Sequence, residues 1–214
     1  LQEPQALFVL SSAAKTIDDL KTRKIIVAST GVSADNYLMS YLLNQLVGTR
    51  MEFVTGYQGQ GDIFMAMERG EAQANSAGYS NFFVSKGDWI KSGFLSIPVQ
   101  FGDTRVNELK DTPTAIELAP DDASRAALRY FAQKFKAARP LMLPPDVPAE
   151  RIAALRAAFD ATMRDPAYIA EARRIGLDVN PLTGAEIETI LDGIFATPEP
   201  VVARLRDLIA RAGK

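Results

Sequence analysis

The apolar positions of the chain switch repeatedly between the period of a buried strand and that of an amphipathic helix. The clearest switch lies between residues 24 and 48. Ile25, Ile26 and Val27 form a β-branched run, which predicts a buried strand. After a turn of small residues at 30–33, the apolar positions recur with the spacing of one helix face, at Leu38, Met39, Leu42, Leu43 and Leu46.

Two later segments repeat this strand–turn–helix pattern. Met51–Val54 predicts a strand that ends in a turn at 57–61, with a helix over 63–69 behind it. Residues 72–77 predict a third strand, which ends at the turn 78–81. Three such units in series predict parallel strands joined by right-handed crossovers. We therefore expect the three turns to converge at one carboxyl edge of the sheet, where open α/β folds bind ligands.

Further apolar runs predict strands at 7–10, 94–101 and 141–143. Pro98 inside the second of these indicates an edge strand, a bulge or a crossing segment, because proline cannot donate to a central ladder. Beyond Pro148 the pattern predicts four helical segments and no strand. The expected organisation is an α/β lobe over 1–143 and a helical C-terminal segment over 144–214, either as two domains or as one domain with an arm that covers another.

Composition excludes several function classes. The 214 residues include 24 Lys and Arg against 26 Asp and Glu, so the net charge of −2 gives no electrostatic case for nucleic acid. Cysteine and histidine are both absent. A cysteine nucleophile, a Ser-His-Asp triad and a zinc site built from histidine or thiolate are therefore impossible. This composition argues for binding rather than catalysis.

The sequence carries no apolar run long enough to cross a bilayer and no visible signal peptide. Its first residues lead directly into an apolar strand pattern, which we take as the sign of a processed chain or a fragment.

The turn after the first strand–helix switch is a candidate anion site. A strand that turns through small residues into a helix presents unpaired backbone N–H groups and the positive end of the helix dipole. Ser33 or Asp35 is expected to cap the helix. An ordinary strand-to-helix loop that binds nothing remains the alternative.

Other motifs have simpler structural interpretations. The run Gly56–Gly61 lacks the Lys-Ser/Thr of a P-loop and the spacing of a dinucleotide fingerprint. The acid pairs at 18–19 and 121–122 are typical of helix starts. Trp89 is expected to pack, and the arginines of the C-terminal third alternate with acids as on a solvated helix surface.

An ordered set of motifs resembles a known family. The set comprises V-A-S-T-G-V-S, V-T-G-Y-Q-G-Q-G, M-E-R-G-E-A-Q, D-T-P-T-A-I-E-L, P-P-D-V-P-A-E-R-I-A-A-L-R-A-A-F, M-R-D-P and P-L-T-G-A-E. In this order and spacing the chain resembles the Bug-type receptors, the periplasmic substrate-binding proteins of tripartite tricarboxylate transporters. The resemblance implies a periplasmic-binding-protein-like lobe with a mostly parallel sheet flanked by helices, followed by a helical C-terminal tail. It also implies that 1–143 is the α/β ligand-binding lobe, the second of a two-lobed receptor, and that 144–214 belongs partly to the other lobe.

The resemblance also implies a function and a site. These receptors have two lobes that close on small carboxylates without chemistry, and they pass the ligand to membrane transporter subunits. Neither a cofactor nor a metal is implied. Carried over by position, the ligand-binding residues are Ser29, Thr30, Gly31, Val32, Ser33, Tyr57, Gly59, Gly78, Tyr79 and Ser80.

The chain departs from the family pattern in three places. The strand–helix units that usually open the first lobe have no counterpart before Leu1. Asp35 stands where a histidine is common near Tyr37, and Ala77 stands where the third strand often ends in an acid, which disfavours ligands with an amino group.

Two other function classes stay open. One is a sensory or regulatory ligand-binding domain of the same fold. The other is an enzyme that uses carboxylates or a lysine, for which Asp35 and Asp62 are the acids at the turn edge.

Overall fold

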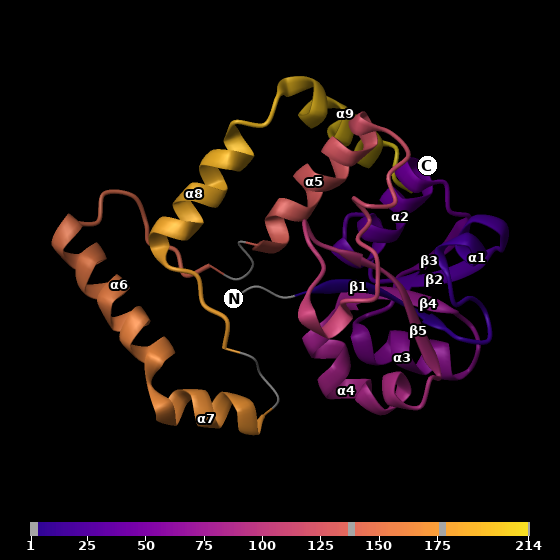
Figure 1. Ribbon diagram of the computed structural model, residues 1–214, viewed down its shortest axis with the longest axis horizontal. Coiled ribbons are helices and arrows are strands. Elements are labelled where there is room, and N and C mark those ends of the chain that lie inside the picture. Colours follow the sequence, from indigo (N-terminus) through magenta and orange to yellow (C-terminus); the bar gives the residue numbers. More distant parts are fainter. Residues whose placement is uncertain (1–3, 137–139, 176–178, 214) are drawn as a thin grey trace. The chain divides into compact units, whose positions relative to one another are not determined.

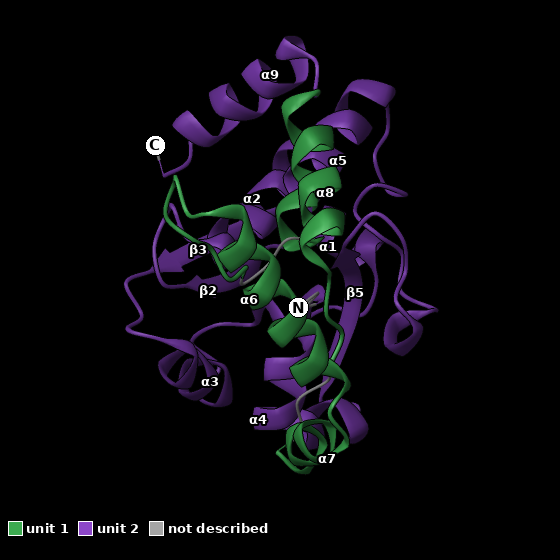
Figure 2. Cartoon of the chain, turned by 90° about the vertical axis from the view of Figure 1, so that its left-hand side faces the viewer, with its two compact units in different colours: residues 1–3, 133–196 green, residues 4–132, 197–214 purple. Residues whose placement is uncertain are grey.

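The computed structural model describes residues 4–136, 140–175 and 179–213 (Figure 1). Within them the chain forms two compact units: one comprises Pro4–Ala132 together with the segment from Thr197 onward, and the other lies within Gln133–Ala196 (Figure 2). The predicted boundary between 143 and 144 refers to the lobes of a two-lobed receptor and stays a prediction. The compact units divide ten residues or so earlier, and the last helix belongs to the larger unit.

The larger unit is built on one five-stranded sheet. Its strands are β1 (Gln5–Leu10), β2 (Ile25–Ser29), β3 (Met51–Thr55), β4 (Ala74–Gly78) and β5 (Leu95–Phe101), in the order β3-β2-β4-β1-β5. Strand β2 runs parallel to β3 and β4, whereas β1 is antiparallel to both β4 and β5. Four strands therefore share one direction, which confirms the predicted mostly parallel sheet, and β5 lies at an edge, one of the alternatives that Pro98 indicates.

Helices cover both faces of this sheet. The helices that follow the strands are α1 (Ile17–Thr22), α2 (Asp35–Val47), α3 (Gln60–Glu68) and α4 (Tyr79–Lys91). Figure 1 shows α2 against one face of the sheet and α3 and α4 against the other. Beyond β5 lie a 3-10 turn, Asn107–Leu109, and α5 (Asp122–Lys136), and α9 (Glu199–Ala210) ends the unit.

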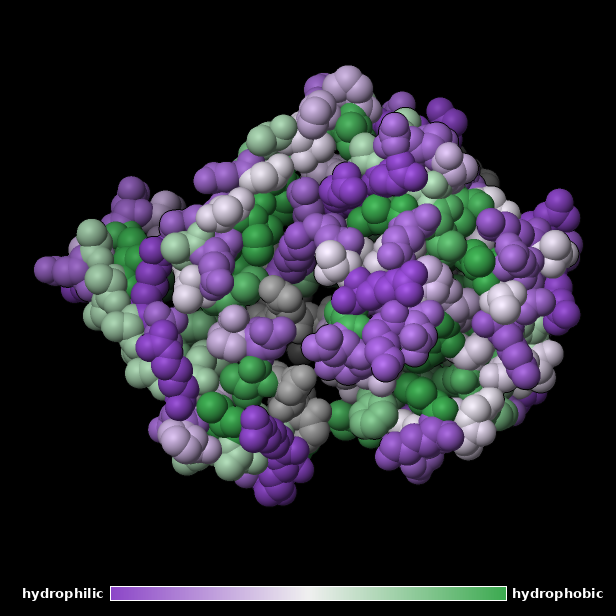
Figure 3. All heavy atoms as spheres, viewed as in Figure 1, coloured by the Kyte–Doolittle hydropathy of each residue, from purple (hydrophilic) through white to green (hydrophobic). Residues whose placement is uncertain are grey.

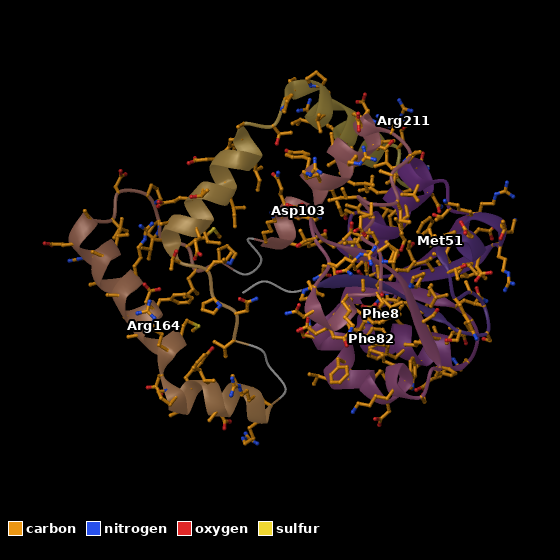
Figure 4. The ribbon with its side chains drawn as sticks, viewed as in Figure 1. Phe8, Met51, Phe82, Asp103, Arg164 and Arg211 are labelled. Carbon is orange, nitrogen blue, oxygen red and sulfur yellow. The ribbon has the colours of Figure 1, made fainter. Side chains whose placement is uncertain are left out.

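The core on the α3 and α4 face is aromatic. The rings of Phe8 and Phe82 stack with centroids 3.8 Å apart, and Phe64 meets Phe82 edge-on at 4.9 Å (Figure 4). Trp89 packs edge-on against Phe64 and Phe94, as expected for a packing residue. Phe8 and Phe82 are almost completely buried, so this cluster holds both helices to the sheet.

The smaller unit consists of helices joined by loops. Its helices are α6 (Ala149–Arg164), α7 (Pro166–Arg174) and α8 (Gly184–Phe195). Arg156 pairs with Glu188, and Arg174 pairs with Glu171 at 2.6 Å, as expected of solvated helix surfaces. Hydrophobic and hydrophilic residues are interspersed over the face of this unit that Figure 3 shows.

One predicted strand does not form. Residues 141–143 are irregular, and Leu141 and Met142 are 84% and 83% exposed. Prolines at 140, 144 and 145 flank this run, and because they cannot donate to a ladder, the three apolar residues cannot be extended into a longer strand.

Helix starts follow the acid patterns in two of three cases. At α1, Asp19 N donates to Thr16 Oγ1, and Asp19 Oδ2 accepts from Thr16 N, which completes a capping box. At α5, Asp121 Oδ1 accepts from Ser124 N at 2.7 Å. At α2 the capping residue is Ala34, with no side-chain cap, so the prediction of Ser33 or Asp35 was wrong. No helix in the described parts of the chain has the length and hydropathy to cross a membrane.

Candidate functional site

The parallel strands bring the three predicted turns to one edge of the sheet. Ser29 at the end of β2 pairs in register with Thr55 at the end of β3, and Val27 of β2 pairs with Ala74 of β4. The turns that follow these strands therefore begin on the same side of the sheet (Figure 1). The turns around Gly31, Gly59 and Gly78 thus lie at the same edge of the sheet, as predicted.

A pocket of about 500 Å³ lies at this edge, within the larger unit. It is bounded by the turn after β2, the start of α3, the end of β4, the first turns of α4 and the start of β1. Its lining residues are Gln5, Thr30, Ala34, Asp35, Asn36, Met39, Gln60, Ser76, Ala77, Gly78, Asn81, Phe82 and Ser85.

Two of the predicted site residues, Thr30 and Gly78, line this pocket. Gly59 lies directly beside it, since it is the N-cap of α3 and Gln60 follows it. Tyr57 is half-buried against the aromatic core instead. Whether any of these residues binds a ligand stays a prediction.

The rest of the first turn surrounds the pocket without lining it. Gly31 accepts a hydrogen bond from the N–H of Ala34 at 3.1 Å, which tightens the turn before α2. Val32 and Ser33 are exposed. The Oγ of Ser29 is fully buried and has no hydrogen-bond partner among the described residues.

In the third turn, too, only some of the predicted residues line the pocket. The ring of Tyr79 lies between Phe8 and Phe83, with centroid distances of 6.5 and 5.9 Å, so it belongs to the aromatic core. Burial raises the pKa of its hydroxyl, and Glu108 adds to the effect. Ser80 is half-buried and does not line the pocket.

Asn36 is a lining residue that sequence reasoning missed. Its Oδ1 accepts long hydrogen bonds of 3.4 Å from both the backbone N–H and the hydroxyl of Thr30. Because the oxygen is directed at Thr30, the NH₂ group of the same amide remains as a donor. A polar residue in the first turn of a helix that follows such a loop is the signal that identifies it.

Gln60 is the second missed residue, and it belongs to a chain of amides. Its Nε2 donates to Asn75 Oδ1 at 2.8 Å, and Asn75 Nδ2 donates to the carbonyl oxygen of Ala28 at 3.0 Å. Asn75 lies on β4 and is completely buried, and its amide reaches across to the neighbouring strand β2. The signal in the sequence is a pair of amides, Gln73 and Asn75, within a segment that otherwise predicts a strand, where amide side chains are disfavoured.

A buried hydroxyl pair lies beneath the pocket. The Oγ atoms of Ser40, on α2, and Ser76, on β4, lie 2.8 Å apart, and both side chains are fully buried. This contact ties α2 to the strand that carries Ser76 into the pocket lining.

The lining contains one acid, Asp35, and neither lysine nor arginine. The hydrogen-bonding groups that the lining offers are therefore amides, hydroxyls and the start of α2, and it offers no cation for an ion pair with an anion. Asp62 does not line the pocket, and its Oδ2 accepts from the N–H of Gln58 at 3.2 Å. The described residues thus do not bring Asp35 and Asp62 together as an acid pair, and they hold no metal-ligand cluster of three or more side chains.

Three solved structures resemble the chain. A TctC solute-binding protein from Polaromonas matches 95% of it with a TM-score of 0.65 and 14% identity. MatC from Rhodopseudomonas palustris with bound malate matches 97% at 0.60 and 18% identity. The periplasmic binding protein BugD matches 97% at 0.61 and 15% identity.

These matches establish the fold. The chain spans about two thirds of the length of each structure, with coverages of 67%, 67% and 66% respectively. No protein-family model matches the sequence, and no curated protein matches it significantly. The predicted resemblance to Bug-type receptors is therefore confirmed at the level of the fold.

Proposed function

We propose that this chain, which has the fold of the TctC and Bug-type periplasmic binding proteins, binds a small organic carboxylate in the pocket at the end of β2. In this proposal it acts in the periplasm as a receptor and delivers the acid to the membrane subunits of a tripartite tricarboxylate-type transporter. The observation that carries the proposal is the position of the pocket, where three strand–helix turns meet at one sheet edge.

The first turn supplies the groups that a carboxylate needs. The backbone N–H of Asn36, in the first turn of α2, has no acceptor among the described residues, and Ala34 provides no side-chain cap that would compete for it. The NH₂ of Asn36 adds a directed donor beside it. Oxygen atoms of a carboxylate accept from both kinds of donor.

A lining without lysine or arginine fits a receptor that must release its ligand. An arginine or lysine in a closed pocket would add strong charge-assisted hydrogen bonds. Amide, hydroxyl and backbone donors hold a carboxylate through ordinary hydrogen bonds, each of which contributes a modest net stabilisation. Affinity then depends on several contacts made together.

The solved neighbours are longer than this chain, and this adds a second set of contacts to the proposed site. They are longer than this chain by about a third of their own length, so a second set of contacts from outside the 214 residues is part of the proposed site. The malate in MatC belongs to that protein, and it supports the class of ligand proposed here.

Thermal unfolding of the full-length protein with a panel of acids tests the binding step. The panel contains succinate, malate, glutarate, adipate, citrate and benzoate, with sodium chloride at matched ionic strength as the control. An acid present at about 100 times its Kd stabilises the folded state by about 2.7 kcal/mol, which raises Tm by several degrees. Absence of stabilisation by every acid at millimolar concentration contradicts the proposal.

A matched pair of variants locates the site. Asn36→Leu removes the amide donor in the pocket lining, and we expect it to weaken binding of the stabilising acid at least tenfold by calorimetry. Asn107→Leu makes the same change at an exposed position outside the lining and is expected to leave Kd unchanged. Equal effects of the two variants would place the acid elsewhere. Uptake of that acid by cells that lack the protein tests the delivery step.

A further inference from the structure

The orientation of the Gln60 amide is determined by a backbone carbonyl oxygen, which can only accept hydrogen bonds. The carbonyl oxygen of Ala28 can only accept, so the NH₂ group of the buried Asn75 must face it. Asn75 Oδ1 then faces Gln60, and Gln60 must direct its own NH₂ group at that oxygen. A flipped Gln60 would set its Oε1 against Asn75 Oδ1, with two acceptors in contact.

This orientation leaves the Gln60 oxygen as an unused acceptor. Gln60 is half-buried and lines the pocket, and within the described residues no side chain or backbone group donates to its Oε1. The second hydrogen of Nε2 is also unused. The oxygen is the atom that distinguishes a hydroxyl from a methylene, because a hydroxyl can donate to it and a methylene cannot.

We propose that Gln60 is a specificity-determining residue, oriented by Asn75, and that the acid bound in this pocket carries a hydroxyl group that donates to Gln60 Oε1. This inference rests on the proposed function and narrows its substrate class to hydroxycarboxylates. The carboxylate lies at the donors of the first turn, near Thr30 and Asn36, and the hydroxyl points to the start of α3.

The physical reason is the cost of covering an acceptor without satisfying it. Solvent water in an empty pocket can donate a hydrogen bond to Gln60 Oε1. An acid without a hydroxyl displaces this water and leaves the oxygen without a donor, whereas the hydroxyl of a hydroxy acid takes over the hydrogen bond. A site built around a hydrogen bond to a ligand hydroxyl discriminates more strongly than an apolar pocket discriminates an added methylene. Since one net hydrogen bond corresponds to roughly tenfold in affinity, we expect about a tenfold preference for the hydroxy acid.

Calorimetry with matched pairs of acids on the full-length protein tests the proposal. The pairs are malate with succinate, 2-hydroxyglutarate with glutarate, 3-hydroxyadipate with adipate, and 4-hydroxybenzoate with benzoate. We expect the pair that binds to show about a tenfold lower Kd for its hydroxy member. We expect Gln60→Met to abolish that preference by weakening only the hydroxy acid. Gln58→Met makes the same change two residues earlier, in the turn before α3 and outside the lining, and should retain the preference.

The role of Asn75 is tested by ligand selectivity, because a merely structural role would change stability without changing the preference for the hydroxy acid. We expect Asn75→Ser to reduce the preference for the hydroxy acid in the wild-type background and to leave it unaltered in the Gln60→Met background. An equal preference in wild type and Gln60→Met, or tighter binding of the acid without a hydroxyl, overturns the inference while the carboxylate receptor stands. Failure of all eight acids to bind overturns both.

Discussion

The backbone N–H of Gly213 donates a hydrogen bond of 3.1 Å to the hydroxyl oxygen of Tyr37, in the first turn of α2. Gly213 also lies so close to Val32 that a Cβ at this position would be 2.7 Å from Val32 Cγ1. Gly213 therefore packs directly against the turn that precedes α2, beside the proposed anion site.

This packing predicts the effect of Gly213→Ala. Gly213 has φ +78°, a conformation that a side chain adopts only with strain, and the added methyl group would collide with Val32. We expect a loss of about 1–2 kcal/mol in the free energy of unfolding, limited by release of the tail. Urea denaturation measures it. Gly193→Ala, in helix α8 with open space around its Cβ, should be neutral or stabilising.

The aromatic core predicts a large effect of Phe82→Ala. Phe82 is 1% exposed and its ring contacts those of Phe8, Phe64 and Trp89. Truncation leaves a cavity between the sheet and α3, which we expect to cost about 3–5 kcal/mol in urea or thermal unfolding. Its neighbour Phe83 is 39% exposed, so Phe83→Ala should cost much less. Comparable losses in the two variants would contradict this assignment of the core.

The hydroxyl pair beneath the pocket predicts non-additive mutations. Ser76→Ala leaves the buried Ser40 hydroxyl without its partner, which we expect to cost about 1–2 kcal/mol. The double variant Ser40→Ala/Ser76→Ala removes both polar groups, and its loss should be smaller than the sum of the single losses. Chemical denaturation of the four proteins measures the coupling, and strict additivity would show that the two hydroxyls do not interact.

The Asn36 amide predicts a separation of binding from stability. Asn36→Asp retains an oxygen that accepts from Thr30 but replaces the donor with a second, charged oxygen. We expect the free energy of unfolding to stay within about 0.5 kcal/mol of wild type, while affinity for the bound acid falls roughly a hundredfold through like-charge repulsion. Calorimetry and urea denaturation on the same preparation check both halves. Retained affinity would show that Asn36 does not face the ligand carboxylate.

The carboxylates at chain turns predict the pH profile of stability. Hydrogen bonds from backbone N–H groups lower the pKa of Asp19, Glu117 and Glu186, with the donors Lys15, Thr114 and Thr183 as the respective main causes. A lowered folded-state pKa stabilises the fold above the unfolded pKa, near 3.8 for Asp and 4.5 for Glu, and this stability is lost as pH falls through the folded value.

We therefore expect a Tm that is nearly constant from pH 8 to 5.5, where the absence of histidine removes the usual titration, and that falls steadily below about pH 4.5. Glu117→Gln should lower Tm at pH 7 and flatten part of the acid slope. Thermal unfolding across this range is the measurement, and an unchanged acid slope in the variant would show that Glu117 does not contribute.

Local pattern was enough to predict much of the fold. The β-branched run at 25–27 and the helical spacing after it correspond to β2 and α2, and Thr16 and Asp19 form the cap that their spacing indicates. These features depend on neighbours a few residues apart. Residues 141–143 show the limit, because their apolar side chains match a strand pattern while the prolines on both sides confine the run to three residues.

The amino-acid sequence by itself determined the strand–turn–helix units, the common direction of β2, β3 and β4, and hence the sheet edge where a ligand would bind. Only the tertiary structure decided that β1 enters the sheet antiparallel, that Gln60 and Asn36 line the pocket, and that Gly213 returns to Tyr37 across 176 residues. The physical reason is that periodicity and capping depend on local backbone geometry, whereas a pocket is formed by side chains from distant segments whose contacts leave no periodic signal in the sequence.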